Sequence, residues 1–332
     1  MQKPTAIFLL GQDAQPLIYS KEVIQEIQLL TDCDGRVHNA QEILAKPEKY
    51  SNVQIIFSGW GAPRMDEALL GALPQLKAYF FGAGTVRYVT SDAFWKREIL
   101  ITSAYQANAI PVAEFTVAGI VFSLKRVLAF NYGLKGEGTM PTKLSGVYKG
   151  SRVGIISLGA IGRRVCQILS HYDLDLIAYD PYAPSELFAE LSVERVADLE
   201  TLFGSCDVVS LHAPSLPETE ALITRKLLMS MPEGATFINT ARGAIVDEFA
   251  LIEVLTERKD LSAMIDVIVD ENRYEESPLL KMPNVLLTPH IAGSGGRECH
   301  RLGDMVFEEL RRYLASEPAL TPITEAESLR MA

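Results

Sequence analysis

The stretch VGIISLGAIG, from Val153 to Gly162, decides the fold of this chain. It reads as an apolar strand that passes into a helix through a turn at Ser157. The spacing is that of the dinucleotide-binding pattern G-x-G-x-x-G, with a serine in place of the first glycine. The stretch therefore predicts either a dinucleotide-binding turn or a serine nucleophile at a strand-to-helix turn.

Each glycine of such a turn has a separate task. The first allows the tight turn, the second lets the backbone approach the pyrophosphate, and the third lets the helix pack on the strand. Gly159 and Gly162 keep the second and third tasks. Ser157 is small enough to take the turn at modest cost, unless the local φ is positive. The helix from Ala160 and Ile161 onward is expected to direct its free amides at the phosphates.

A second apolar strand, LDLIAYD, ends in Asp180, 18 residues after Gly162. An acid at this strand end accepts hydrogen bonds from the ribose hydroxyls of the adenosine. It also repels a 2′-phosphate, and the PYAP segment after it offers no arginine to bind one. The sequence therefore predicts that NAD is preferred over NADP.

The alternative is a serine hydrolase with Ser157 as its nucleophile. Its elbow pattern, G-x-S-x-G, needs a glycine at residue 155, where the chain has the β-branched Ile155. Asp266 and His290 do follow Ser157 in the chain order that such hydrolases use. Because this alternative leaves the two glycines and the acid after the next strand unexplained, we rank it well below the dinucleotide site.

Length and composition limit the classes of protein. A chain of 332 residues favours two domains, and 48% hydrophobic residues supply a sizeable core. The 31 basic and 42 acidic residues give a net charge of −11, which argues against a nucleic-acid or anionic-membrane surface. The four cysteines stand singly and suggest reduced thiols in the cytoplasm, and no zinc-ligand spacing appears, so we expect no metal.

No targeting or membrane segment is expected. The apolar run near the N-terminus is too short for a signal peptide. The longest apolar run, Ile110 to Leu124, contains Glu114 and is shorter than a membrane span. We predict a buried helix there, with Pro111 in its first turn.

Short apolar strands alternate with helical stretches along the whole chain, a pattern that predicts an α/β fold with parallel sheets. Two series of strands indicate two Rossmann-like or flavodoxin-like domains. The expected strands are TAIFLL, VQIIFSG, LKAYFFG and ILITSA, then SRVGIIS, LDLIAYD, DVVSLHA, ATFINT, LSAMIDV and NVLLTPH. A last helix, 297–315, has apolar residues in a four-residue rhythm and is expected to return to the first domain. The prediction is a discontinuous substrate domain, 1–105 plus 296–332, with a cofactor domain, 106–295, inserted into it.

Three kinds of charged residue follow strands of the second series. Arg242 comes after ATFINT, at the edge where ligands bind to open α/β sheets, and a guanidinium holds a carboxylate through two parallel hydrogen bonds. Pairing of Arg242 with Asp247 or Glu248 explains it equally well. His290 follows NVLLT and is a candidate acid/base, although a core histidine is the more common case. One of the acids at 266–276, placed against that imidazole, would raise its pKa and orient it.

Taken together, these motifs closely resemble the NAD-dependent D-2-hydroxyacid dehydrogenase family. The resemblance covers essentially the whole chain and is strongest from about residue 105 to 295. It rests on INTARG with VDE, on DV followed by SPLLKMPNVLLTPHIAG, on DVVSLHAPSLPETEALI and on ANAIPVAEFTVAGI.

The resemblance implies catalytic roles for Arg242, Glu271 and His290. Asn272 departs from the proline that usually follows the glutamate, so this loop is expected to be less rigid, and Glu275 remains a weaker candidate. The family's anion-binding loop matches FFGAGTVR, where the substrate carboxylate is expected at the amides of residues 83–85. The implied substrate-binding residues are Ala83, Gly84, Thr85 and Arg242.

The resemblance also implies a set of coenzyme contacts, a homodimer formed through the cofactor domain, and the interconversion of 2-keto acids and D-2-hydroxy acids. Little sequence follows the last helix, so we expect no added regulatory domain. NAD-sensing co-repressors share the scaffold and are a second possibility, although the chain lacks a long disordered tail. The expected coenzyme contacts are Ser157, Gly159, Ala160, Ile161, Gly162, Asp180, Pro181, Ala213, Pro214, Thr219, Thr240, Ala241, Arg242, Asp266, His290 and Gly293.

Overall fold

The computed structural model describes residues 3–135, 140–141 and 146–331, and the chain divides into two compact units. Unit 1 combines the chain up to Asn108 with the segment from Ser294 to Met331. Unit 2 runs from Ala109 to Gly293. The sequence prediction placed these two boundaries after residues 105 and 295.

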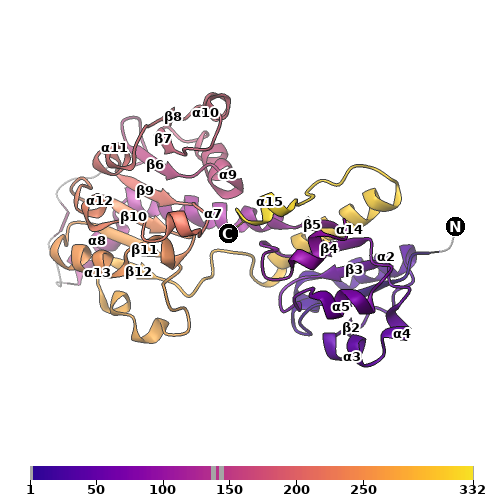
Figure 1. Ribbon diagram of the computed structural model, residues 1–332. Coiled ribbons are helices and arrows are strands. Elements are labelled where there is room, and N and C mark those ends of the chain that lie inside the picture. The colour runs from indigo at the N-terminus through magenta and orange to yellow at the C-terminus, as the bar shows by residue number, and fades with distance from the viewer. Residues whose placement is uncertain (1–2, 136–139, 142–145, 332) are drawn as a thin grey trace. The chain divides into compact units, whose positions relative to one another are not determined.

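Unit 1 is built on a five-stranded parallel sheet (Figure 1). The strand order is β2-β1-β3-β4-β5, the order of a flavodoxin-like fold. The strands are β1 (Ala6–Leu9), β2 (Val37–His38), β3 (Ile55–Ser58), β4 (Ala78–Phe81) and β5 (Leu100–Ser103). The helices are α1 (Ala14–Ile18), α2 (Lys21–Leu30), α3 (Ala40–Ala45), α4 (Pro47–Tyr50), α5 (Glu67–Ala72), α6 (Asp92–Trp95), α14 (His300–Leu314) and α15 (Glu325–Ser328), with the 3-10 turn η5 (Gly296–Cys299).

Successive side chains of these strands point to opposite faces of the sheet, and both faces are buried. Phe8, Phe57 and Phe80 pack with α1, α2 and α14 on one face. Their neighbours Tyr79 and Phe81 pack with α3, α5 and α6 on the other. The last long helix therefore belongs to the core of unit 1, although it is far from it in sequence.

Unit 2 is built on a seven-stranded sheet, also parallel throughout. The strand order is β12-β11-β10-β9-β6-β7-β8. The strands are β6 (Arg152–Ile156), β7 (Asp175–Tyr179), β8 (Glu194–Arg195), β9 (Val208–Leu211), β10 (Thr236–Asn239), β11 (Ser262–Ile265) and β12 (Val285–Leu287). The helices are α7 (Tyr105–Leu124), which begins in unit 1, α8 (Val127–Leu134), α9 (Ala160–Leu169), α10 (Ser185–Glu190), α11 (Leu199–Ser205), α12 (Arg225–Met229) and α13 (Glu248–Glu257), with the 3-10 turns η1 (Pro217–Thr219), η2 (Gly243–Ile245), η3 (Tyr274–Glu276) and η4 (Pro278–Lys281).

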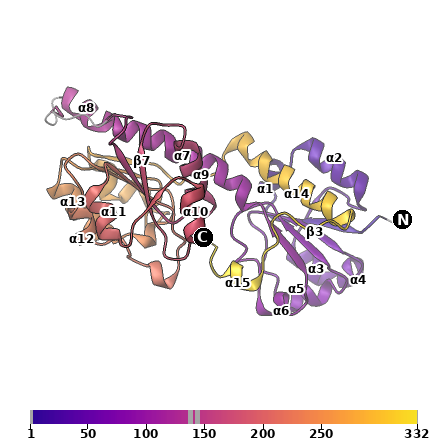
Figure 2. The ribbon, with the colours of Figure 1, turned by 90° about the horizontal axis from the view of Figure 1, so that it is seen from above.

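Two layers of helices cover this sheet, and they can be followed in Figure 2. Ile155 and Ile238 face the layer of α7, α9 and α10. Ile156 and Phe237, one residue away along the same strands, face the layer of α11, α12 and α13. Because both faces are buried, the strands are almost continuously apolar, which is why they were visible in the sequence.

The structure confirms the predicted α/β class with parallel sheets, and each of the ten expected segments contains a strand. The two-residue strands β2 and β8 were not predicted, because so short a pairing leaves no periodicity. The prediction that Pro111 lies in a first helical turn is wrong: α7 begins at Tyr105, where the Ser103 hydroxyl accepts the Tyr105 amide at 3.2 Å. Pro111 therefore lies inside the helix.

The helix α7 is the one described helix whose length and composition would also suit a membrane span. Of its most apolar window, 56% is buried within the structure, as in the core helix of a globular protein. This observation is weak evidence for a membrane segment.

Candidate active site

The carboxyl ends of the parallel strands in unit 2 all lie at one edge of the sheet, and almost all the predicted coenzyme residues follow these ends. The strands from β6 to β8 are added toward one edge of the sheet and those from β9 to β12 toward the other. The strand order therefore reverses between β6 and β9, which are neighbours in the sheet but not in sequence. Ligands of open α/β sheets bind at such a switch point. The glycine turn follows β6 directly, and Ala213 and Pro214 follow β9.

The glycine turn has the features that a pyrophosphate needs. Gly159 caps α9 without a side-chain hydrogen bond, so the amides of the first helical turn have no intrahelical partner. A β-carbon at Gly159 would meet no atom within 4 Å, which leaves its backbone open to a ligand. A β-carbon at Gly162 would lie 2.0 Å from the Ser157 carbonyl oxygen, so this position requires glycine. The turn therefore fits a dinucleotide.

Ser157 adopts a φ of 75°, in the left-handed region that favours glycine. The expectation that a serine takes this turn at modest cost held only for a negative φ, so it does not apply here. A β-carbon in this region costs roughly 1–2 kcal/mol. Ser157 is therefore a strained residue of the glycine turn.

We expect Ser157→Gly to raise the free energy of unfolding by about 0.5–1 kcal/mol, because relief of this strain exceeds the entropy that a glycine adds to the unfolded chain. Urea unfolding measures the difference. Ser157→Ala is the matched control, since it keeps the β-carbon and is expected to bring no such gain. An equal gain in both variants would contradict a backbone origin.

Asp180, at the end of β7, binds the glycine turn directly. Its carboxylate accepts the Leu158 amide at 2.7 Å, and the amides of Tyr182 and Ala183 at 2.8 and 3.0 Å. The Ser157 hydroxyl lies 3.5 Å from the same carboxylate. The predicted ribose acid is thus fixed next to the turn by backbone hydrogen bonds.

The strand order rules out the serine hydrolase. Ser157 follows β6 and His290 follows β12, and four strand intervals separate β6 from β12. At about 4.8 Å per interval, the two strand ends lie about 19 Å apart. A nucleophile and its base must be within hydrogen-bond reach of each other.

Glu271 and His290 form a hydrogen-bonded pair. The distance from Glu271 Oε2 to His290 Nδ1 is 2.8 Å, and both side chains are about 40% exposed, at 38% and 41%. A carboxylate on Nδ1 leaves Nε2 as the nitrogen available to a substrate. No hydrogen bond joins Glu275 to His290 in the described part of the chain.

The backbone of His290 also lies in the left-handed region, with a φ of 52°. Its amide donates to the Asp266 carbonyl at 2.8 Å. The carboxylate of Asp266, which is fully buried, accepts the Thr288 hydroxyl at 2.6 Å and the amides of Ile291 and Ala292 at 2.9 Å. Asp266, predicted as a coenzyme contact, thus holds the turn that presents the histidine.

Arg242 follows β10 and lies close enough to Glu271 to interact with it electrostatically. Burial lowers the pKa of the Arg242 guanidinium, and the Glu271 carboxylate acts in the opposite direction. Asp247 instead accepts the Ala250 amide, and Glu248 accepts the Val269 amide. The interpretation of Arg242 as a simple partner of these two acids does not match the structure.

Gly243 allows the Arg242 segment to approach the segment that leads to Glu271. A β-carbon on Gly243 would lie 2.1 Å from the carbonyl carbon of Ile268 and 2.5 Å from the amide of Val269. The sequence prediction missed this glycine, because only the tertiary contact shows why the residue after the arginine must be small.

The remaining predicted residues are distributed between the two units. Thr240 pairs its hydroxyl with that of Thr116 at 3.2 Å, and the Thr219 hydroxyl donates to the Pro214 carbonyl at 2.6 Å. The substrate loop, residues 83–85, lies in unit 1, where the Ser103 hydroxyl donates to the carbonyls of Ala83 and Gly84. Its role in binding stays a prediction. In the described residues no group of three or more His, Cys, Asp or Glu is arranged to hold a metal ion.

A parallel sheet with a glycine turn at its switch point and an Arg, Glu and His set along the same edge defines a dinucleotide-binding α/β protein of the dehydrogenase type. The family model described as D-isomer specific 2-hydroxyacid dehydrogenase, NAD binding domain, matches residues 118–292, more than half of the chain. The chain belongs to this family.

Curated relatives agree with this assignment. The chain is 34% identical over 254 residues to an (S)-sulfolactate dehydrogenase of Chromohalobacter salexigens, covering 76% of this chain and 82% of the relative. It is 29% identical over 280 residues to the D-3-phosphoglycerate dehydrogenase of Methanocaldococcus jannaschii, covering 84% of this chain and 53% of the relative. The chain thus spans about half the length of the phosphoglycerate dehydrogenases it matches.

The fold matches that of a D-isomer specific 2-hydroxyacid dehydrogenase from Lactobacillus delbrueckii ssp. bulgaricus in its NAD complex. The TM-score is 0.77 at 24% identity, over 96% of this chain and 100% of the other. At this identity the likeness supports the fold alone.

Proposed function

We propose that this protein interconverts a 2-keto acid and a D-2-hydroxy acid by hydride transfer with NAD(H). The hydrogen bond of 2.8 Å between Glu271 and His290 carries the proposal, because it is the arrangement of an acid/base histidine oriented by a carboxylate. Arg242 at the same sheet edge supplies a group that binds a substrate carboxylate.

Each of the three residues has a separate task in the proposed reaction. When bound, NADH supplies the hydride that reduces the substrate carbon. Arg242 binds the substrate carboxylate and polarises the keto oxygen. Protonated His290 donates from Nε2 to that oxygen, while Glu271 on Nδ1 stabilises the imidazolium. In the oxidising direction His290 accepts the hydroxyl proton. General acid catalysis of this kind contributes about 10²–10⁴ in rate.

NADH oxidation with a panel of 2-keto acids tests the proposal. We expect the absorbance of reduced nicotinamide to fall with at least one of the 2-keto acids. Fluorescence titration is expected to show NADH binding. NADH binding without turnover on any member would favour the alternative of an NAD-sensing binding protein. Absence of NADH binding would reject both.

We propose that NADH is preferred over NADPH, because the Asp180 carboxylate is fixed beside the glycine turn by three backbone amides. Asp180→Ala is expected to weaken NADH binding about tenfold or more, since a hydrogen bond to a charged group is lost, and to reduce the ratio of the two dissociation constants. Asp173→Ala, an exposed acid of the same unit, is the control. An unchanged ratio would refute the ribose assignment.

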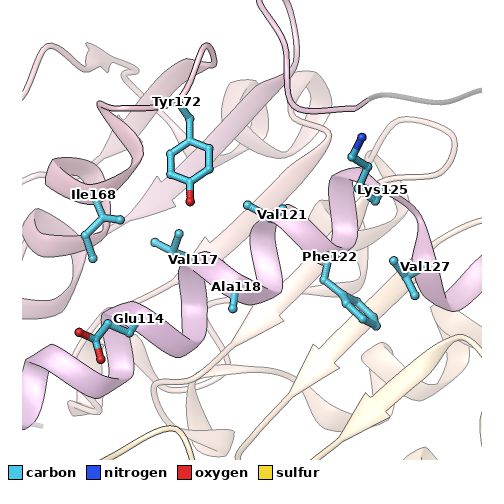
Figure 3. A pocket seen from close by; sticks show the side chains of 9 residues that line it. All are labelled: Glu114, Val117, Ala118, Val121, Phe122, Lys125, Val127, Ile168 and Tyr172. Carbon is cyan, nitrogen blue, oxygen red and sulfur yellow. The ribbon is translucent and has the colours of Figure 1, made fainter.

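We propose a homodimer formed through the outer face of α7. An apolar hollow on this face lies between α7 and the end of α9, and Figure 3 shows Val117, Val121, Ile168 and Tyr172 around it. Phe122 and Tyr172 there are 40% and 38% exposed. A second copy of the chain would cover this apolar surface.

Phe122→Asp is expected to convert the dimer to a monomer, because a charge at an apolar interface is desolvated without a partner. Light scattering coupled to gel filtration measures the mass. Phe249→Asp replaces an 84% exposed phenylalanine on α13 and should leave the mass unchanged. A wild-type mass of one chain would contradict the dimer.

The four unpaired cysteines support a reducing compartment such as the cytoplasm.

A further inference from the structure

The loop that carries Glu271, residues 269–276, is held largely by contacts within itself. The Asn272 and Arg273 amides donate to Asp270, and the Arg273 guanidinium pairs with Glu276. Every residue of this stretch is exposed except Tyr274. Contacts within the loop do not fix its position relative to the His290 turn, yet the Glu271 carboxylate must stay within hydrogen-bond distance of the imidazole.

Tyr274 anchors this loop at two points. Its ring packs against the apolar core between the sheet and the layer of α11, α12 and α13. Its hydroxyl donates to the Asp266 carbonyl oxygen at 3.0 Å. The same carbonyl oxygen accepts the His290 amide at 2.8 Å. A carbonyl oxygen has two lone pairs and can accept two hydrogen bonds. The Asp266 carbonyl thus binds both the loop that carries Glu271 and the turn that carries His290.

The phenol is a permanent donor in this position. Burial raises the pKa of Tyr274 to about 12, and the negative charges of Glu271 and Asp266 act in the same direction. The hydroxyl therefore keeps its proton at neutral pH and well above it.

We propose that Tyr274 is a positioning residue for the acid–base pair, in which its hydroxyl, bound to the Asp266 carbonyl, holds Glu271 against Nδ1 of His290. Only the kinetic consequence rests on the proposed function; the hydrogen-bond geometry of His290 is independent of it.

The direct test is the ¹⁵N chemical shift of His290 Nδ1, read through the ring C–H protons. With five histidines in the chain, His290→Asn assigns the signal by its loss. Glu271→Gln gives the shift without the carboxylate. We expect Tyr274→Phe, which keeps the ring and removes only the hydroxyl, to move the shift toward the Glu271→Gln value. A shift identical to wild type would overturn the proposal.

Turnover supplies a second readout that a merely structural role would not reproduce. Tyr274→Phe is expected to lower kcat about tenfold, with an unchanged dissociation constant for NADH and no further loss in a Glu271→Gln background. An equal loss in both backgrounds would overturn the proposal, because the two residues would then act independently. Tyr148→Phe, at a 68% exposed tyrosine of the same unit, is the control. If wild type reduces no 2-keto acid, the proposed function fails, and the imidazole shift still decides the role of Tyr274.

Discussion

Replacing His290 with asparagine is expected to lower kcat for 2-keto-acid reduction by about 10²–10⁴, while the dissociation constant of NADH stays nearly unchanged. The loss follows from removal of the proton donor, because asparagine has no group that titrates. His290 is only one of the expected coenzyme contacts, and the glycine turn that binds the pyrophosphate follows β6, far along the sheet, so the affinity for NADH should change little. Stopped-flow turnover and fluorescence titration measure the two effects separately.

Asparagine is the suitable replacement because His290 has a φ of 52°, a backbone conformation that asparagine tolerates better than most residues. The variant therefore removes the imidazole without adding strain to the turn. His171→Asn, at an exposed histidine of the same unit, serves as the control. Retained turnover, or loss of NADH binding together with turnover, would mean that the histidine is structural.

Arg242→Ala is expected to reduce kcat/KM for the keto acid by about 30- to 5,000-fold. KM rises because the carboxylate loses its partner, and kcat falls because the keto oxygen is no longer polarised. Loss of one partner of a hydrogen-bonded charge pair in a desolvated site costs about 2–5 kcal/mol, which corresponds to this range. Arg242 is suited to the task because its side chain is half-buried, and this partial burial lowers the pKa of its guanidinium.

Arg242→Lys separates charge from shape. Lysine keeps the positive charge but lacks the planar fork, so we expect an intermediate loss of kcat/KM. Arg225→Ala, an exposed arginine that pairs with Glu257 on the surface, should behave as wild type. An unchanged KM in Arg242→Ala would exclude this residue from substrate binding.

The fold was predictable from the sequence because its strands are buried on both faces. Segments such as Val208–Leu211 and Thr236–Asn239 are short apolar runs between helical stretches, and such runs indicate parallel strands whatever the register. The start of α7 was not predictable in the same way. Its first turn depends on a hydroxyl of the preceding strand, and the proline at 111 suggested a later start.

The candidate site was predictable only in part. Arg242 and His290 were candidates from their positions after strands, whereas Glu271 was implied only by the family resemblance. The structure places Glu271 and His290 within hydrogen-bond distance. The supporting contacts were not identified, because they join residues distant in sequence through backbone atoms. The Asp266 carbonyl that binds Tyr274 and His290 has no signature in the sequence, and the positive φ of Ser157 was stated only as a condition.

The most direct test of the central claim follows one hydrogen atom. NADH with both C4 hydrogens of the nicotinamide replaced by deuterium is incubated with the protein and a 2-keto acid that it reduces, and the product is analysed by NMR and chiral chromatography. We expect deuterium on C2 of the D-2-hydroxy acid, and about 10²–10⁴ times less of this product per unit time with His290→Asn. A product without deuterium at C2, or one of the L configuration, would contradict it.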